Sequence, residues 1–174
     1  MVQMSGAAGA NKVYFEKQGP DNLCGLHCLN AVFQGPYFDE VSLGQLAVNL
    51  DKAERALTRQ DSMNFKSENV ATDGMFSIQV LNAAVQSMNQ QAMLINILSE
   101  DVKGADLIKE QAFIGNKGNH WFTIRKVHGV WYNCNSTNIV PPGPQFVSDM
   151  MLDAFLSSLG NGGFTIYTLR GMQL

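Results

Sequence analysis

The sequence has few cysteines and no long hydrophobic run. Its 174 residues include three cysteines, Cys24, Cys28 and Cys134, an odd and sparse set that makes no complete disulfide framework. This usage is typical of a reducing compartment, so we expect the protein in the cytoplasm, the nucleus or both. No run of about 18 apolar residues occurs, and the sequence therefore predicts no membrane-spanning helix.

Positive charge is also scarce. The 12 Lys and Arg residues are outnumbered by 15 Asp and Glu residues, which gives a formal net charge of -3. Proteins that hold nucleic acid or an anionic membrane through charge carry a basic patch, so we expect neither as the main partner. A hydrophobic content of 45% is enough for one domain with its own core, and we expect a monomer.

Composition also predicts the limits of that domain. Residues 1–12 are mostly small and polar and lack the apolar centre of a signal peptide, so we expect a flexible leader. Residues 13–171 are expected to form the folded domain, and residues 172–174 a short tail. The sequence shows no internal repeat and no second domain.

The stretch from Gln18 to Asn30 organises the chemistry of the chain. Residues 19–22 are turn formers, and the apolar residues that follow predict a buried helix over 22–33. Cys24 then lies at a helix N-terminus, where the helix dipole favours a thiolate. The amide of Gln18 and the backbone N–H of Cys24 would together form two donors for an oxyanion.

The apolar periodicity predicts both helices and strands. Helices are expected over 42–50, 52–59, 77–88, 105–110 and 146–159. The first two would form a polar helical hairpin, followed by a loop over 60–74. Strands are expected over 92–98, 112–115, 119–127, 130–135 and 164–169, with a proline-rich loop at 141–144 before the last helix. His128 and Gly129 are typical of a two-residue hairpin turn.

A cysteine nucleophile needs a base, and three histidines are candidates. His128 is expected to be solvated in its turn. His27 follows Cys24 by three residues on one helix, which leaves little room for a substrate, so we expect a structural hydrogen bond there. His120 opens a strand, and a turn at His128 brings Asn135 within two residues of the position opposite it, on the same face.

The amide of Asn135 would accept the Nδ1–H of His120 and leave Nε2 for the thiol of Cys24, as in a Cys-His-Asn triad. The residues alone leave two alternatives: ordinary polar residues of a hairpin, and a metal site of Cys24, His27, Cys28 and His120. Ligands spaced as Cys-x-x-His-Cys fan around one helix, whereas zinc sites usually draw pairs from separate elements. We therefore expect no metal and no other cofactor.

Five short segments occur in the order, and at roughly the spacings, of one family, although the loop from Gln18 to Cys24 is one residue longer here. They are residues 16–18 (Glu-Lys-Gln), 23–30 (Leu-Cys-Gly-Leu-His-Cys-Leu-Asn), 76–79 (Phe-Ser-Ile-Gln), 120–123 (His-Trp-Phe-Thr) and 131–136 (Trp-Tyr-Asn-Cys-Asn-Ser). Over about residues 13–171 the sequence resembles the Josephin domain, the papain-like cysteine protease module of ataxin-type deubiquitinases. The resemblance implies an α+β, papain-like fold, in which an antiparallel sheet packs against a helical subdomain carrying a helical-hairpin arm at about 41–60.

The resemblance also implies roles for single residues. Cys24 corresponds to the nucleophile, His120 to the general base, Asn135 to the residue that orients it and Gln18 to the oxyanion donor. The implied reaction is hydrolysis of the bond after the C-terminal glycine of ubiquitin. A Josephin module that binds ubiquitin with little or no turnover is the alternative.

The implied partner is ubiquitin, a ubiquitin chain or a ubiquitinated protein. The residues expected to contact it are Tyr37, Phe38, Ile78, Gln79 and Trp121. From the residues alone, the two adjacent aromatics have two interpretations, packing beneath the next helix or an exposed docking patch. Met88 stands where some relatives carry an aromatic residue that contributes to ubiquitin binding.

Overall fold

A computed structural model of the chain describes residues 12–20, 22–58, 76–137 and 143–174. Nearly all of the expected leader and the loop expected over 60–74 lie outside the described residues, as do the first two residues of the proline-rich loop at 141–144. Among the described helices, none is both long enough and apolar enough to cross a membrane.

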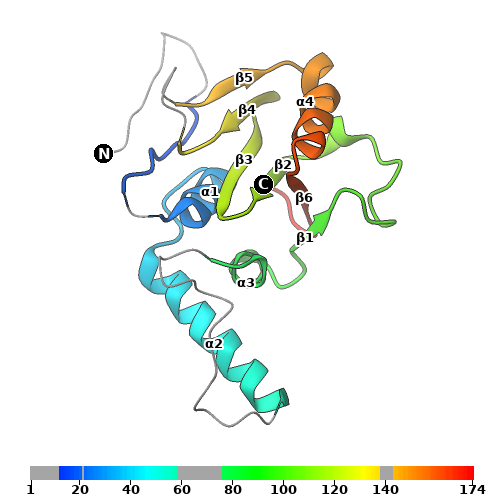
Figure 1. Ribbon diagram of the computed structural model, residues 1–174. Helices are drawn as coiled ribbons and strands as arrows, with labels where there is room; N and C mark the ends of the chain where they lie inside the picture. Colours follow the sequence, from blue (N-terminus) through cyan, green and yellow to red (C-terminus); the bar gives the residue numbers. More distant parts are fainter. Residues whose placement is uncertain (1–11, 21, 59–75, 138–142) are drawn as a thin grey trace.

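Within the described residues, the strands form one antiparallel sheet in the order β1-β6-β2-β3-β4-β5 (Figure 1). The strands are β1 (Met93–Asn96), β2 (Ala112–Lys117), β3 (His120–Val127), β4 (Val130–Cys134), β5 (Gln145–Val147) and β6 (Thr165–Arg170). His128 and Gly129 both have positive φ, 49° and 80°, as a tight two-residue hairpin turn requires. This turn pairs Thr123 with Cys134, which is the register that the sequence predicts.

Helices cover both faces of the sheet. They are α1 (Cys24–Phe33), α2 (Glu40–Thr58), α3 (Ile78–Met88) and α4 (Asp149–Asn161), with a short 3-10 turn η1 (Leu107–Lys109). Alternating side chains along the central strands serve the two faces. On β3, Trp121 packs with α1 and α3, whereas Phe122 packs with α4. The α+β fold predicted from the sequence is confirmed.

The arm differs from its prediction, because α2 is one continuous helix where two helices were expected. No glycine or proline lies between Leu50 and Thr58, and the intervening residues are mostly good helix formers. Asp51, at the predicted break, is buried and sits within the helix. The polar composition therefore marks an exposed face and not a turn. Figure 1 shows α2 extending away from the sheet.

The start of the last helix is also corrected. Phe146 and Val147 belong to β5, which pairs with the outer edge of β4, and α4 begins only at Asp149. Ser148, in an extended conformation, occupies the N-cap position that serine favours. The sequence placed Phe146 and Val147 in the helix because their spacing continues its apolar pattern, although Phe146 is in fact exposed.

We expect the two halves of α2 to differ in local stability. Leu43 and Ala47 are fully buried in the core, whereas Leu57 is 86% exposed near the far end. A segment with few buried apolar contacts opens more often, so amides of residues 53–58 should exchange about tenfold faster or more than those of 43–50. Hydrogen exchange of the free protein measures this difference. Equal protection along the whole helix would contradict it.

Candidate active site

Cys24 is the first residue of α1, and its sulfur lies against the end of the β2–β3 turn and the start of β3. Sγ is 3.3 Å from the carbonyl oxygen of Asn119, and it accepts a hydrogen bond from the backbone N–H of Trp121 at 3.4 Å. These two residues flank His120. The Trp121 N–H and the N-terminal end of the helix both favour negative charge on the sulfur. The structure thus brings Cys24 to the main chain from which His120 projects.

His120 and Asn135 meet at the open end of the β3–β4 hairpin. Nε2 of His120 is 2.9 Å from Oδ1 of Asn135. The same oxygen accepts the backbone N–H of Thr137 at 3.1 Å and its hydroxyl at 2.8 Å. An atom that accepts these bonds is the amide oxygen, so Nε2 of His120 carries its proton and Nδ1 is left to accept one.

The predicted roles of the two ring nitrogens of His120 are therefore wrong, because Asn135 binds Nε2 and not Nδ1. Nε2 is the far end of the ring and reaches across to the end of the neighbouring strand. Nδ1 lies nearer the main chain that the sulfur of Cys24 contacts. The ring also stacks on buried Phe122, with centroids 6.1 Å apart and planes 16° from parallel, which restricts its rotation.

Gln18 is held beside these residues by Ser136, which the sequence pattern did not predict. Its backbone N–H donates to the carbonyl of Ser136 at 3.0 Å, and the Ser136 hydroxyl donates to its Oε1 at 3.2 Å. The oxygen of the amide is thereby held, and its nitrogen is the end available to donate. Ser136 follows Asn135 directly, so one short turn supports both Gln18 and the histidine partner. The sequence offered one signal for this role of Ser136, which is that the residue ends the last of the five shared segments.

His27 makes the structural hydrogen bond expected of it, and its partner is Glu16. Nδ1 of His27 is 2.6 Å from Oε2 of Glu16, and the other carboxylate oxygen accepts from the hydroxyl of Tyr14 and from Asn30 at 3.1 Å. Burial alone would raise the pKa of Glu16, but the hydrogen bonds from His27, Tyr14 and Asn30 hold it below its usual value. Burial and the adjoining carboxylate raise the pKa of Tyr14.

Glu16 should therefore stabilise the fold in a pH-dependent way. Its pKa is lowered on folding, so the stabilisation is present above the ordinary carboxyl pKa and is lost as pH falls through the folded value. We expect Glu16→Gln to lower the free energy of unfolding by about 1 to 3 kcal/mol at pH 7, and by less in acid. Urea unfolding at several pH values measures both. Glu100→Gln, at an exposed ion pair with Lys103, is the control and should change little.

The four residues of the alternative metal site have separate partners. The Cys24 sulfur contacts the main chain of β3, His27 contacts Glu16, and His120 contacts Asn135. Cys28 is buried against Thr123, at 3.0 Å from its hydroxyl. Among the described residues, no three His, Cys, Asp or Glu side chains converge as metal ligands.

The residues expected to contact ubiquitin divide by exposure. Tyr37 is 58% exposed, Gln79 is exposed and Ile78 is half-buried. Phe38 is buried in the core cluster that includes Leu43 and Ala47 of α2, as the packing interpretation expects for this one of the two aromatics. Trp121 is also buried, and its indole N–H donates to the carbonyl of Phe76 at 3.0 Å. The accessible part of this set is therefore Tyr37, Ile78 and Gln79.

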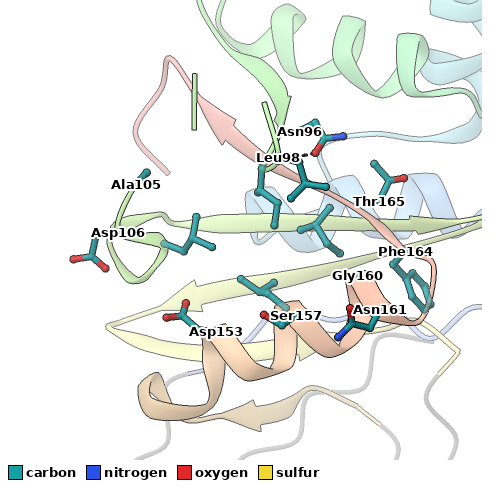
Figure 2. Close-up of a pocket in the computed structure, with 14 residues that line it drawn as sticks. Asn96, Leu98, Ala105, Asp106, Asp153, Ser157, Gly160, Asn161, Phe164 and Thr165 are labelled. Carbon is teal, nitrogen blue, oxygen red and sulfur yellow. Dashed lines mark hydrogen bonds between the residues drawn. The ribbon is translucent and has the colours of Figure 1, made fainter. Parts of the chain in front are cut away.

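A cavity of about 660 Å³ lies on the face of the sheet that α4 covers, opposite to α1 (Figure 2). It opens between the loop after β1, α4 and the start of β6, and its lining includes Leu98, Asp106, Asp153 and Phe164. None of the predicted site residues is among the described residues that line it. The candidate active site is instead the junction of α1 with the start of β3.

Comparison with known proteins gives a consistent family. The Josephin family matches residues 19–170. The ataxin-3 homolog of Arabidopsis thaliana is 36% identical in an alignment that covers 97% of this chain and 62% of that protein. Ataxin-3 of Homo sapiens is 36% identical over 91% of this chain and 45% of its own length, and the ataxin-3 homolog of Caenorhabditis elegans is 33% identical over 93% and 50%.

The chain thus spans about half the length of these relatives, up to 62% for the plant protein. The shared part is the part that carries the candidate site. The family match begins one residue after Gln18 and ends at the last residue of β6, so it includes every helix and strand of the described structure. On this evidence the chain belongs to the Josephin family.

Proposed function

We propose that this chain is a cysteine-dependent deubiquitinase that hydrolyses the bond after the C-terminal glycine of ubiquitin. One observation carries the proposal. His120 contacts Asn135 at 2.9 Å, and the residues on either side of His120, Asn119 and Trp121, contact the sulfur of Cys24 through their main chain. This arrangement supports a Cys-His-Asn triad. Membership of the Josephin family, whose members act as deubiquitinating cysteine proteases, supports ubiquitin as the substrate.

In the first step, Nδ1 of His120 takes the proton of the Cys24 thiol. The thiolate attacks the carbonyl carbon of the terminal glycine and forms a tetrahedral intermediate. The developing oxyanion accepts hydrogen bonds from the backbone N–H of Cys24 and from the amide nitrogen of Gln18. Asn135 keeps the ring oriented throughout, because its oxygen, held in place by hydrogen bonds from Thr137, accepts the Nε2–H of His120.

In the second step, the imidazolium of His120 returns its proton to the departing amine, and the amide bond breaks. Ubiquitin is now a thioester on Cys24. A water molecule, deprotonated by the neutral His120, attacks the thioester carbon, and the thiolate leaves and recovers a proton. The products are free ubiquitin and the amine that it modified.

The body of ubiquitin is expected to bind outside the triad, on Tyr37, Ile78 and Gln79. Tyr37 is the most exposed of these and supplies an aromatic anchor of the kind that interfaces favour. Met88, 41% exposed at the end of α3, adds a flexible apolar side chain to the surface of the helix that Ile78 begins.

The test is ubiquitin that carries a fluorogenic amide on its C-terminal glycine. The proposal predicts release of the fluorophore with saturable kinetics. The alternative, a Josephin module that only binds, predicts that ubiquitin binds with no release above background. Titration with unmodified ubiquitin measures binding separately from release. Binding without release would support the binding module, and neither binding nor release would contradict both hypotheses.

A further inference from the structure

Helix α1 lies along strand β3, and polar contacts join the two at regular intervals. At the start of α1, the Trp121 N–H donates to the sulfur of Cys24 at 3.4 Å. One turn later, the hydroxyl of Thr123 donates to the carbonyl of Cys28 at 2.8 Å. Both positions lie on the face of β3 that packs against α1, since alternate residues of a strand share a face.

A third contact lies at the other end of α1. The Nε–H of buried Arg125 donates to the carbonyl of Val32 at 2.8 Å, and Nη1 donates to the carbonyls of Gln111 and Lys126 at 2.8 and 2.7 Å. The last carbonyls of a helix have no partner within it, so the guanidinium satisfies one of them and complements the negative end of the dipole.

These contacts fix one register between helix and strand. Four residues of a helix rise about 6.0 Å, and two residues of a strand rise about 6.7 Å. Helix positions 24, 28 and 32 are therefore spaced almost equally with strand positions 121, 123 and 125, so all three contacts can form together. Apolar packing alone is less selective, because it tolerates small displacements that a hydrogen bond does not.

Thr123 is the middle contact, and both of its polar functions are used. It is fully buried, and its single hydroxyl proton goes to the carbonyl of Cys28. Its oxygen lies 3.0 Å from the sulfur of Cys28 and so accepts the thiol proton. Burial raises the pKa of Cys28, which keeps that thiol protonated. The hydroxyl thus ties β3 to α1 one turn beyond Cys24.

We propose that Thr123 is a positioning residue that fixes the register of α1 on β3, and through it the place of the Cys24 sulfur beside His120. This inference rests on the proposed function of those two residues. Thr123 touches neither substrate nor the reacting thiol and acts only through the helix. Without its hydroxyl, α1 keeps its apolar packing but shifts slightly, and the reaction slows while ubiquitin, bound elsewhere, binds as before.

The test is Thr123→Val, which keeps the shape of the side chain and removes the hydroxyl. Hydrolysis of the fluorogenic ubiquitin amide should show a kcat lower by about 10- to 100-fold, because small misplacements of reacting groups have effects of this size. KM should be unchanged within about twofold, since uniform binding is not affected. Thr123→Ser retains the hydroxyl and should recover most of kcat.

The matched control is Thr168→Val. Thr168 is also fully buried in the sheet, and its hydroxyl contacts the carboxylate of Glu110 at 2.8 Å and the carbonyl of Ala112 at 3.3 Å, two residues that lie outside α1. It should lose similar thermal stability and keep wild-type kcat. If Thr123→Val loses no more kcat than Thr168→Val, or if Thr123→Ser is as slow as Thr123→Val, the positioning role is wrong.

A measurement without ubiquitin separates this inference from the proposed function. If the wild-type protein does not hydrolyse ubiquitin conjugates, the proposed function fails, but alkylation of Cys24 by iodoacetamide still reports on the sulfur and its base. That rate, followed at Cys24 by mass spectrometry, should fall in Thr123→Val and not in Thr168→Val. Equal rates in the two variants would overturn the inference whatever the substrate.

Discussion

Cys24→Ala is expected to abolish hydrolysis of ubiquitin conjugates while the fold stays intact. The sulfur is the only atom at the N-terminus of α1 that can form the thioester, so turnover should fall by at least about 10⁴-fold. The side chain is small and 3% exposed, and alanine suits a helix, so the free energy of unfolding should change by about 1 kcal/mol. Turnover of the fluorogenic amide and thermal unfolding measure the two effects.

Cys28→Ala is the matched control, one turn further along the same helix. Cys28 is equally buried, and its carbonyl, which Thr123 binds, remains in the variant. We expect it to retain most of the wild-type turnover. Full activity in Cys24→Ala together with loss of activity in Cys28→Ala would show that the nucleophile has been assigned to the wrong cysteine.

His120→Ala and Asn135→Ala should lower kcat by different factors. His120 moves the proton in every step, so its loss should lower kcat by about 10³- to 10⁴-fold. Asn135 only orients the ring, and groups with such supporting roles are worth about 10- to 100-fold. Steady-state kinetics of both variants on the same substrate measure the difference.

A thermal unfolding scan of each variant guards against a folding defect. The control for the hairpin is Thr137→Val, which removes one of the bonds to Asn135 Oδ1 and leaves the backbone N–H bond. It should reduce kcat less than Asn135→Ala does. Two equally small losses in His120→Ala and Asn135→Ala would point to a different base, and His27 would be the next candidate.

The pairing of His120 with Asn135 was predictable from the sequence because it depends on only two local features, the position of the turn and the alternation of side chains along a strand. The tight turn at His128 fixes the register of β3 and β4. Because side chains along a strand alternate between the two faces of the sheet, the register also determines which residues of the two strands share a face. Which ring nitrogen meets Asn135 was not predictable in the same way. That choice depends on the stacking of the ring on Phe122 and on the place of the Cys24 sulfur, and both are set by tertiary packing.

Strand β5 and the contact of Glu16 with His27 were not predicted, because no periodic pattern in the sequence encodes them. β5 has three residues, too few to show an alternation, and it forms only because the edge of β4 is available to pair. Glu16 reaches His27 from an irregular segment eleven positions earlier. The continuity of α2 was missed for a different reason. The sequence becomes more charged after Leu50, which suggested a second helix, although most of these residues favour a helix and continue the first one.

The most direct test of the account is labelling by ubiquitin whose C-terminal glycine carbonyl is replaced by a thiol-reactive electrophile. The account predicts one adduct per chain, mapped by peptide mass spectrometry to Cys24, formed at a saturable rate and strongly slowed in His120→Ala. Cys28 and Cys134, whose thiol pKa values are raised by burial, should stay unmodified. An adduct on either of those cysteines, or no adduct while ubiquitin still binds, would contradict it.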